Sequence, residues 1–182
     1  PIQTTAYWKN NKIKIDGFDD DWDKSEMSVI RDSKLAVGIA CDNDFMYLAL
    51  APLERSVAMQ IMMTGLTVWL DSTGKGNKIC GFHYPIGMGG LPVHGFGEEK
   101  KERNPLDLGR RNTPQEIEII GPGPYDRIRY NLKELSGVAV QLTHEKDGMF
   151  YEIRIPLHSI DGSPFMVNAV NGRPRSLRIA TG

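Results

Sequence analysis

Short stretches of alternating polar and apolar residues, separated by turn-forming residues, constrain the fold of this chain more than any other feature. In residues 35–41 the larger side chains Leu35, Val37, Ile39 and Cys41 recur at every second position, and residues 45–50 return as a second apolar strand after the turn of residues 42–44. Alternation with a period of two places every second side chain on the same face of a strand, and Asp and Asn favour tight turns. This segment is therefore the clearest predicted β-hairpin in the sequence.

A second hairpin is predicted over residues 66–86. Residues 66–71 alternate in the same way, which places Trp69 on the face opposite Val68. A turn containing glycine at 72–77 precedes a further predicted strand at 78–86. Because an antiparallel pair needs only a short connection, these two strands are expected to lie side by side.

The rest of the chain extends this pattern. Further strands are predicted over residues 12–15, 27–29, 116–120, 127–130, 138–143, 149–155 and 177–180, one helix over 53–63 ending at Gly65, and a long loop over 87–113. About ten short strands with one short helix and a long loop predict an all-β fold. We expect one domain over residues 1–182, a two-sheet antiparallel β-sandwich of jelly-roll-like form.

Composition narrows the classes of function. The chain has 182 residues and a formal net charge of -1, which gives no basis for a nucleic-acid partner. No apolar run is long enough for a transmembrane segment. Cys41 and Cys80 are too few for a disulfide framework. They are expected as two thiols, or as one bridge if their strands are neighbours.

The acidic loop around Trp22 was considered as a calcium site, because Asp19, Asp21 and Asp23 alternate. A calcium loop of the helix-loop-helix type needs Gly at its sixth position and Glu at its twelfth, where this chain has Lys24 and Ile30. The favoured interpretation is a solvated turn whose carboxylates cap nearby backbone amides. We expect no metal site in this loop.

No set of residues in the sequence has the spacing of a catalytic or metal centre. The four histidines have no short metal-ligand spacing, and no Ser, His and Asp order carries a nucleophile-elbow context. No pair of acidic residues can be assigned acid and base roles from spacing. The chain is therefore expected to be no enzyme, with no cofactor and no metal.

The surface around the long loop is the expected ligand site. Tyr84, His94 and Arg110 would supply an aromatic surface and planar hydrogen-bonding groups, which suit the apolar face and polar rim of a sugar ring. The alternative is that Phe82 and Tyr84 are ordinary alternating strand residues, of which one face packs inward. The sequence leaves both interpretations open.

Four segments, in order and spacing, resemble one family. They are Ile15-Asp16-Gly17 followed by Asp20, Asp21 and Trp22; residues 35–50 with Tyr47-Leu48; Val68-Trp69-Leu70-Asp71; and Tyr151-Glu152-Ile153-Arg154-Ile155-Pro156. This set is similar to the family 9 carbohydrate-binding modules and the related DOMON-like β-sandwiches. The resemblance implies a bacterial domain that is extracytoplasmic, whether periplasmic, secreted or lipid-anchored.

The resemblance also bears on the ligand. Sugar-binding members clamp a terminal sugar between two exposed tryptophans. Here Trp22 belongs to the scaffold pattern and Trp69 falls at a packing position, which leaves Trp8 as a ligand-binding candidate. No pair of positions carries over the clamp, and Thr64 and Thr67 stand near the places of an acidic pair common in relatives.

Three functions follow as expectations. The leading one is a non-catalytic binding module for a carbohydrate or a cell-surface protein. The second is a structural or protein-interaction domain without a small ligand. The third is a haem-carrying electron-transfer domain, because related sandwiches include haem domains with Met paired with His or Lys, and Met59, Met62 and Met63 cluster near the predicted helix.

Overall fold

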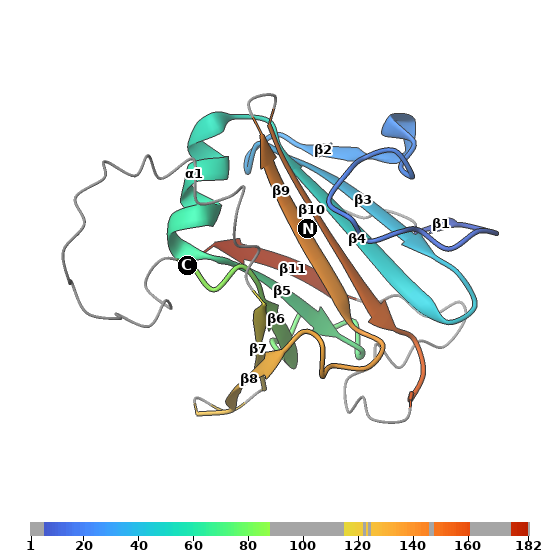
Figure 1. Cartoon of the computed structure of the whole chain (residues 1–182), viewed down its shortest axis with the longest axis vertical. Helices are drawn as coiled ribbons and strands as arrows, with labels where there is room; N and C mark the ends of the chain where they lie inside the picture. The colour runs from blue at the N-terminus through green and yellow to red at the C-terminus, as the bar shows by residue number, and fades with distance from the viewer. Residues whose placement is uncertain are drawn as a thin grey trace.

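Two stacked β-sheets form the body of the protein. The computed structural model describes residues 6–87, 115–121, 123, 125–145, 148–160 and 176–181. These residues contain eleven strands, one α-helix and one short 3-10 helix. Figure 1 shows the two sheets as layers, with the helix α1 at one end. The predicted all-β, two-sheet sandwich is confirmed.

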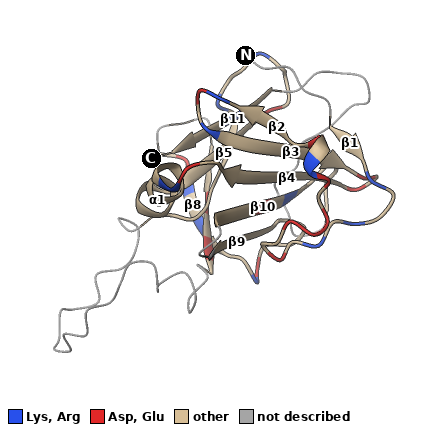
Figure 2. Ribbon diagram, turned by 90° about the horizontal axis from the view of Figure 1, so that it is seen from above, with Lys and Arg blue, Asp and Glu red and all other residues tan. Residues whose placement is uncertain are grey.

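The larger sheet has six strands. Its order is β1-β3-β4-β10-β9, with β2 also paired to β3. The bounds are β1 Tyr7–Trp8, β2 Ser28–Ile30, β3 Leu35–Cys41, β4 Phe45–Pro52, β9 Ala139–Glu145 and β10 Gly148–Pro156. All pairs are antiparallel except β1 with β3. Figure 2, turned by 90°, shows β3, β4, β10 and β9 side by side in one layer.

The smaller sheet has five strands in the order β11-β5-β6-β7-β8. The bounds are β5 Leu66–Asp71, β6 Cys80–His83, β7 Glu116–Ile120, β8 Arg127–Asn131 and β11 Ser176–Thr181. Every pair in it is antiparallel. The predicted hairpin of β5 and β6 is present, although β6 is shorter than the predicted strand over 78–86.

The turn of the first hairpin, between β3 and β4, is built around one carboxylate. Oδ1 of Asp42 accepts hydrogen bonds from the backbone amides of Asp44 at 2.8 Å and Phe45 at 2.7 Å. Oδ2 of Asp42 accepts one from the hydroxyl of Tyr47 at 2.7 Å. An Asp side chain that accepts a hydrogen bond from the backbone amide two residues later forms an Asx turn, in which the side chain mimics a backbone turn. The turn predicted at this position is therefore confirmed.

The main core lies between the sheets. Alternate residues of both sheets meet there, among them Leu48 and Ile153 from one sheet and Val68 and Ile117 from the other, all fully buried. The helix α1, Arg55–Thr64, adds Ala58 and Ile61 to this core. It ends at Gly65, whose φ of 85° suits a residue without a Cβ.

A second, smaller core lies on the outer side of the six-stranded sheet. Trp22 and Ile13 pack there against the sheet residues Tyr47 and Ala49. The segment that carries Trp22 includes η1, Lys24–Glu26, a 3-10 helix capped by the side chain of Asp23. The N-terminal segment therefore covers this face of the sandwich.

Several local predictions are corrected. Residues 12–15 form no strand, because the backbone amide of Lys14 donates to Oδ2 of Asp21 at 2.8 Å instead of to a neighbouring strand. Most of the loop predicted over 87–113 lies outside the described residues. Cys41 on β3 and Cys80 on β6 are free and belong to different sheets, so the condition for a bridge is not met. No helix in the described part is long and apolar enough to cross a membrane.

Candidate functional site

The residues predicted to bind a ligand do not form one site among the described residues. Tyr84 is fully buried, because it follows Phe82 by two positions and shares its inward face. It therefore cannot serve as the exposed aromatic surface that was expected. Trp8 is 60% exposed but lies on β1, in the other sheet. His94 and Arg110 lie outside the described residues.

A better-placed aromatic side chain is Trp69 on β5. Val68 faces the main core, so Trp69 faces outward from the five-stranded sheet, as the alternation predicted. Its cross-strand partner is Gly81 on β6. A Cβ on Gly81 would lie 3.0 Å from both Cε3 and Cζ3 of Trp69. The indole therefore rests on bare backbone, and we call Trp69 with Gly81 beneath it the Trp69 platform.

The Trp69 platform is partly exposed and flanked by two cations. The ammonium of Lys78 lies 5.2 Å from the centroid of the indole. Arg178 on β11 is the cross-strand partner of Trp69 on its other side, and its side chain is exposed. Side chains directly opposite each other in an antiparallel pair are close neighbours. Lys78 thus contacts the ring of Trp69, and Arg178 occupies the paired position on the neighbouring strand.

A row of polar side chains crosses the same outer face. Oγ1 of Thr67 and Nδ1 of His83 are 2.8 Å apart. The carboxylate of Glu118, opposite His83, forms ion pairs with Arg127 at 3.0 Å and Arg129 at 3.5 Å. Burial lowers the pKa of His83, so its ring is uncharged at neutral pH. Figure 2 shows the basic residues along β8.

This polar row is suited to holding the sheet together and to hydrogen bonding rather than to proton transfer. The carboxylate of Glu118 is held by the guanidinium groups of Arg127 and Arg129. The imidazole of His83 is held by Thr67 and by the backbone of Ile86. The arrangement leaves no general acid paired with a general base among these residues.

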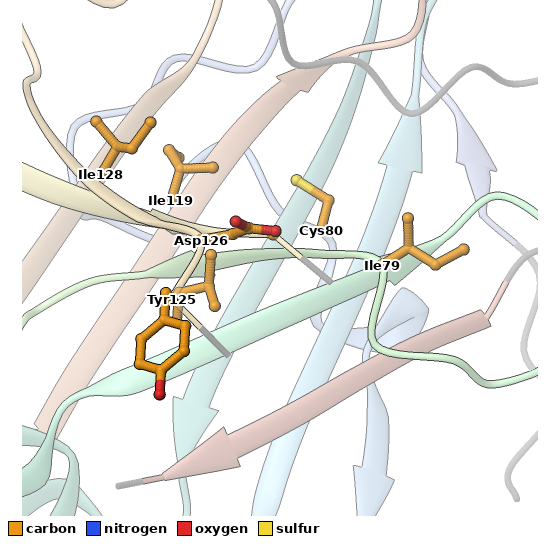
Figure 3. Close-up of a pocket in the computed structure, with 8 residues that line it drawn as sticks. Ile79, Cys80, Ile119, Tyr125, Asp126 and Ile128 are labelled. Carbon is orange, nitrogen blue, oxygen red and sulfur yellow. The ribbon is translucent and has the colours of Figure 1, made fainter. Parts of the chain in front are cut away.

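An apolar pocket of about 420 Å³ opens at the turn between β7 and β8. It is lined by the eight residues drawn in Figure 3, which are Ile79, Cys80, Ile119, Ile120, Gly121, Tyr125, Asp126 and Ile128. Tyr125 is 93% exposed and Ile128 57% exposed at this place. Burial raises the pKa of Cys80 to about 11, so its thiol is protonated at neutral pH. The pocket suits an apolar group.

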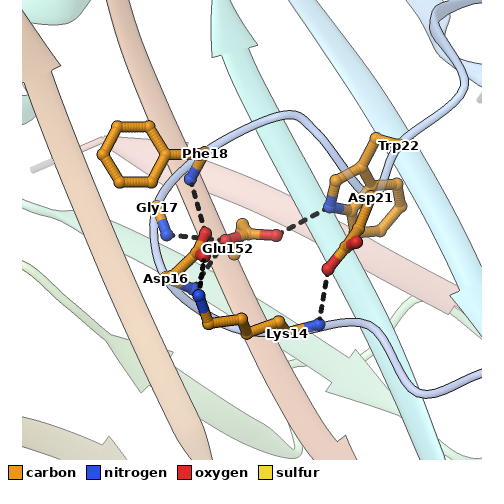
Figure 4. A network of polar contacts seen from close by, with 7 residues as sticks. All are labelled: Lys14, Asp16, Gly17, Phe18, Asp21, Trp22 and Glu152. Atoms are coloured by element: carbon orange, nitrogen blue, oxygen red, sulfur yellow. Dashed lines mark hydrogen bonds and ion pairs between the residues drawn. The ribbon is translucent and has the colours of Figure 1, made fainter.

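Glu152 joins two of the segments on which the family resemblance rests (Figure 4). Its carboxylate accepts hydrogen bonds from the indole of Trp22 at 2.7 Å and from the backbone amides of Gly17 at 2.7 Å and Asp16 at 3.1 Å. Glu152 is fully buried on β10. Burial raises its pKa, while the three N–H donors act in the opposite direction. The network is therefore a structural tie between the N-terminal segment and the sheet.

Within this network, position 17 requires a glycine. It has a φ of 85°, which an L side chain rarely adopts. A Cβ at this position would also collide with the side chain of Thr143 on β9. The Asp16-Gly17 pair in the sequence is thus explained by the close approach of the loop to the sheet.

On the outer face of each sheet a tryptophan ring packs on a glycine of a strand, but the two rings differ in exposure. Trp22 lies over Gly38 of β3, where a Cβ would lie 2.9 Å from the ring, and Trp22 is 6% exposed. Trp69 lies over Gly81 in the same way but remains partly exposed. The first ring is buried as core, whereas the second presents a surface to solvent.

The acidic loop around Trp22 has the role predicted for it. The carboxylate of Asp23 accepts from the backbone amide of Ser25, that of Asp21 accepts from Lys14, and that of Asp19 pairs with Lys24. No group of three potential metal ligands occurs among the described residues. On the helix α1, Met62 packs against the main core, as core filling would have it, and Met63 is exposed. The haem alternative stays a prediction.

Fold and surface together define an antiparallel β-sandwich with one partly exposed tryptophan between two cations. No protein-family model, no curated protein and no solved structure matches the chain. The resemblance to family 9 carbohydrate-binding modules thus stays a prediction.

Proposed function

We propose that this domain is a non-catalytic, extracytoplasmic carbohydrate-binding module whose ligand stacks on the Trp69 platform. The observation that carries the proposal is the partly exposed ring of Trp69, which packs on Gly81 and has the exposed side chain of Lys78 over it. A ligand would stack on this ring by moving Lys78 aside. The C–H face of a pyranose suits an aromatic surface, and its hydroxyl rim suits nearby planar or charged donors. Arg178 and Lys78 supply such donors beside the ring.

Binding without catalysis agrees with the chemistry of this face. Glycoside hydrolysis needs two carboxyl groups at a defined separation, one of them free to exchange a proton. On this face the carboxylate of Glu118 is engaged in ion pairs with Arg127 and Arg129. A sugar on the Trp69 platform would therefore be held but not cleaved.

The test is a screen of the purified chain against a broad glycan panel, followed by calorimetry on each ligand found. Trp69→Ala is expected to raise the Kd at least about tenfold, since truncating a central aromatic residue commonly costs more than 1 kcal/mol. Trp69→Phe should retain part of the affinity because it keeps a ring. Trp8→Ala, in the other sheet, is the matched control and should leave the Kd unchanged.

Two outcomes would end the carbohydrate proposal at this site. One is no binding to any sugar of a broad panel. The other is binding that Trp69→Ala leaves intact while Trp8→Ala abolishes it, which would move the site to β1. The location outside the cytoplasm is tested separately, by fractionating cells of the source organism and detecting the protein with an antibody.

A protein-interaction domain is the second candidate function, favoured by the apolar pocket beside Tyr125. A pocket of this size, with exposed Tyr125 and Ile128 at its rim, suits an apolar side chain of a partner protein. A photo-crosslinking residue in place of Tyr125 should then trap one specific protein in the native host. The same residue in place of exposed Arg31 should not, and equal products at both positions would contradict this candidate.

A further inference from the structure

The two cations at the Trp69 platform differ from the other basic residues of the same sheet. Arg127 and Arg129 on β8 are paired with Glu118. Lys78 and Arg178 form no ion pair with any carboxylate of the described residues. The contact recorded for Lys78 is the one with the Trp69 ring.

Placing two cations at one ring has an electrostatic consequence. Trp69 is the direct cross-strand neighbour of Arg178, and the ammonium of Lys78 lies 5.2 Å from its centroid. Like charges near one another repel, although solvent and salt reduce the effect for exposed groups. A negatively charged ligand group bound beside the ring would be attracted to both cations.

We propose, on the basis of the carbohydrate-binding function proposed above, that the ligand of the Trp69 platform is an acidic glycan containing a uronic acid. A uronate pyranose has the same C–H face that stacks on an indole. Its carboxylate is attached at the edge of the sugar ring and points away from that face. From there the carboxylate reaches the guanidinium of Arg178, whose planar fork binds a carboxylate through two hydrogen bonds. Lys78 adds a second positive charge from the ring side.

The same parts fit an extended nucleic acid less well. Single-stranded nucleic acids need a line of cations along the backbone together with several stacking rings. On this face Arg127 and Arg129 are already paired with Glu118, and Glu116 adds a further exposed carboxylate. One ring with two cations that pair with no carboxylate in the described part of the chain matches a single charged sugar unit.

The experiment compares two forms of one ligand by calorimetry. The probes are a 1,4-linked tetramer of a uronic acid and the same tetramer after reduction of its carboxyl groups to hydroxymethyl groups. The uronate form is expected to bind at least about tenfold more tightly, and its affinity should fall as salt rises from 50 to 500 mM, because exposed ion pairs are screened. A ten-residue oligothymidylate serves as a third probe.

Variants assign the effect to the two cations. Arg178→Gln and Lys78→Gln should each weaken uronate binding about three- to tenfold and leave the reduced tetramer unchanged. Arg31→Gln, an exposed arginine of the turn after β2, is the control and should bind as the unaltered protein does. Circular dichroism and thermal melting confirm that each variant is folded.

The outcomes separate this inference from the function on which it rests. If the reduced tetramer binds as tightly as the uronate and Trp69→Ala abolishes both, the acidic ligand is wrong and the sugar-binding proposal stands. If the uronate binds and Trp69→Ala has no effect on its Kd, both the sugar site at Trp69 and the acidic ligand proposed for it are wrong. Binding would then reflect unspecific attraction between opposite charges. Tighter binding of the oligothymidylate than of the uronate would also overturn the inference.

Discussion

The indole nitrogen of Trp22 donates a 2.7 Å hydrogen bond to Oε1 of Glu152, across 130 residues of sequence. The other carboxylate oxygen accepts from the backbone amides of Gly17 and Asp16. One buried side chain thus holds the N-terminal segment on the outer face of the six-stranded sheet.

The first prediction concerns Glu152→Gln. The amide retains one acceptor oxygen but places an NH2 group where a donor already points, so at least one buried N–H loses its partner. We expect the free energy of unfolding to fall by about 1–3 kcal/mol, measured by urea denaturation. Glu54→Gln, an exposed carboxylate, is the control and should change it by less than about 0.5 kcal/mol.

The second prediction compares the two glycines beneath the tryptophans. Gly38→Ala places a Cβ 2.9 Å from the buried ring of Trp22, which has no room to move, and should cost about 1–3 kcal/mol of stability. Gly81→Ala places a Cβ 3.0 Å from the ring of Trp69, which is partly exposed and can tilt away. Its cost in stability should be smaller, and its effect should appear as weaker ligand binding.

Tryptophan fluorescence and urea denaturation distinguish the two variants. For Gly38→Ala the midpoint of unfolding should shift, whereas for Gly81→Ala the emission of the folded protein should change more than the midpoint. Equal losses of stability in both variants would show that Trp69 is packed as rigidly as Trp22. The Trp69 platform would then be part of the structural core.

The elements that could be predicted from sequence are those fixed by local patterns. The β3–β4 turn follows from Asp42 and its neighbours, and the placement of Trp69 and Val68 on opposite faces follows from alternation along β5. Residues 12–15 show why alternation alone is insufficient. They have the pattern of a strand, but the amide of Lys14 bonds to Asp21 within the same loop.

The candidate site could be predicted only in part, because it depends on register between strands. The sequence places Trp69 on the face opposite Val68, but the family resemblance assigned it to a packing position, and its contact with Gly81 needs the pairing of β5 with β6 at one particular offset. The position of Arg178 beside it needs β11, far along the chain, to pair on the other side. Tyr84 was misplaced because a strand pattern alone leaves open which of its two faces packs inward.

The third prediction concerns Tyr84 and Tyr151, whose rings lie 6.3 Å apart in the main core. Neither hydroxyl has a hydrogen-bond partner among the described residues. A buried polar group without a partner is unfavourable, so removing it should not destabilise the protein. Tyr84→Phe and Tyr151→Phe are each expected to leave the free energy of unfolding unchanged or raise it by about 1 kcal/mol.

Equilibrium urea denaturation checks this expectation, with Tyr47→Phe as the contrasting variant. The hydroxyl of Tyr47 donates to Asp42 at 2.7 Å, and its removal should destabilise the protein by about 1–3 kcal/mol. A loss of similar size in Tyr84→Phe would mean that its hydroxyl has a partner in the folded protein. That outcome would reopen Tyr84 as a polar contact.

The fourth prediction concerns Asp71, the residue that ends β5 two positions after Trp69. Hydrogen bonds from Thr73 and from the backbone amide of Asn77 lower its pKa to about 2, below its ordinary value of 3.8. Between these two values the unfolded chain binds a proton that the folded protein does not. The stabilisation is therefore present above about pH 4 and is lost as the pH falls towards 2.

Asp71→Asn has no proton to bind at this position. Its free energy of unfolding should be lower than that of the unaltered protein at pH 7, because the amide accepts fewer of these hydrogen bonds, and should fall less steeply between pH 4 and pH 2. Asp32→Asn, at an exposed turn, is the control and should preserve the steep fall. Urea denaturation at half-unit pH steps measures all three proteins, and parallel curves for Asp71→Asn and the unaltered protein would contradict the assignment. Because Asp71 ends the strand that carries Trp69, a confirmed effect would also predict weaker ligand binding in acid, as the turn after the Trp69 platform loosens.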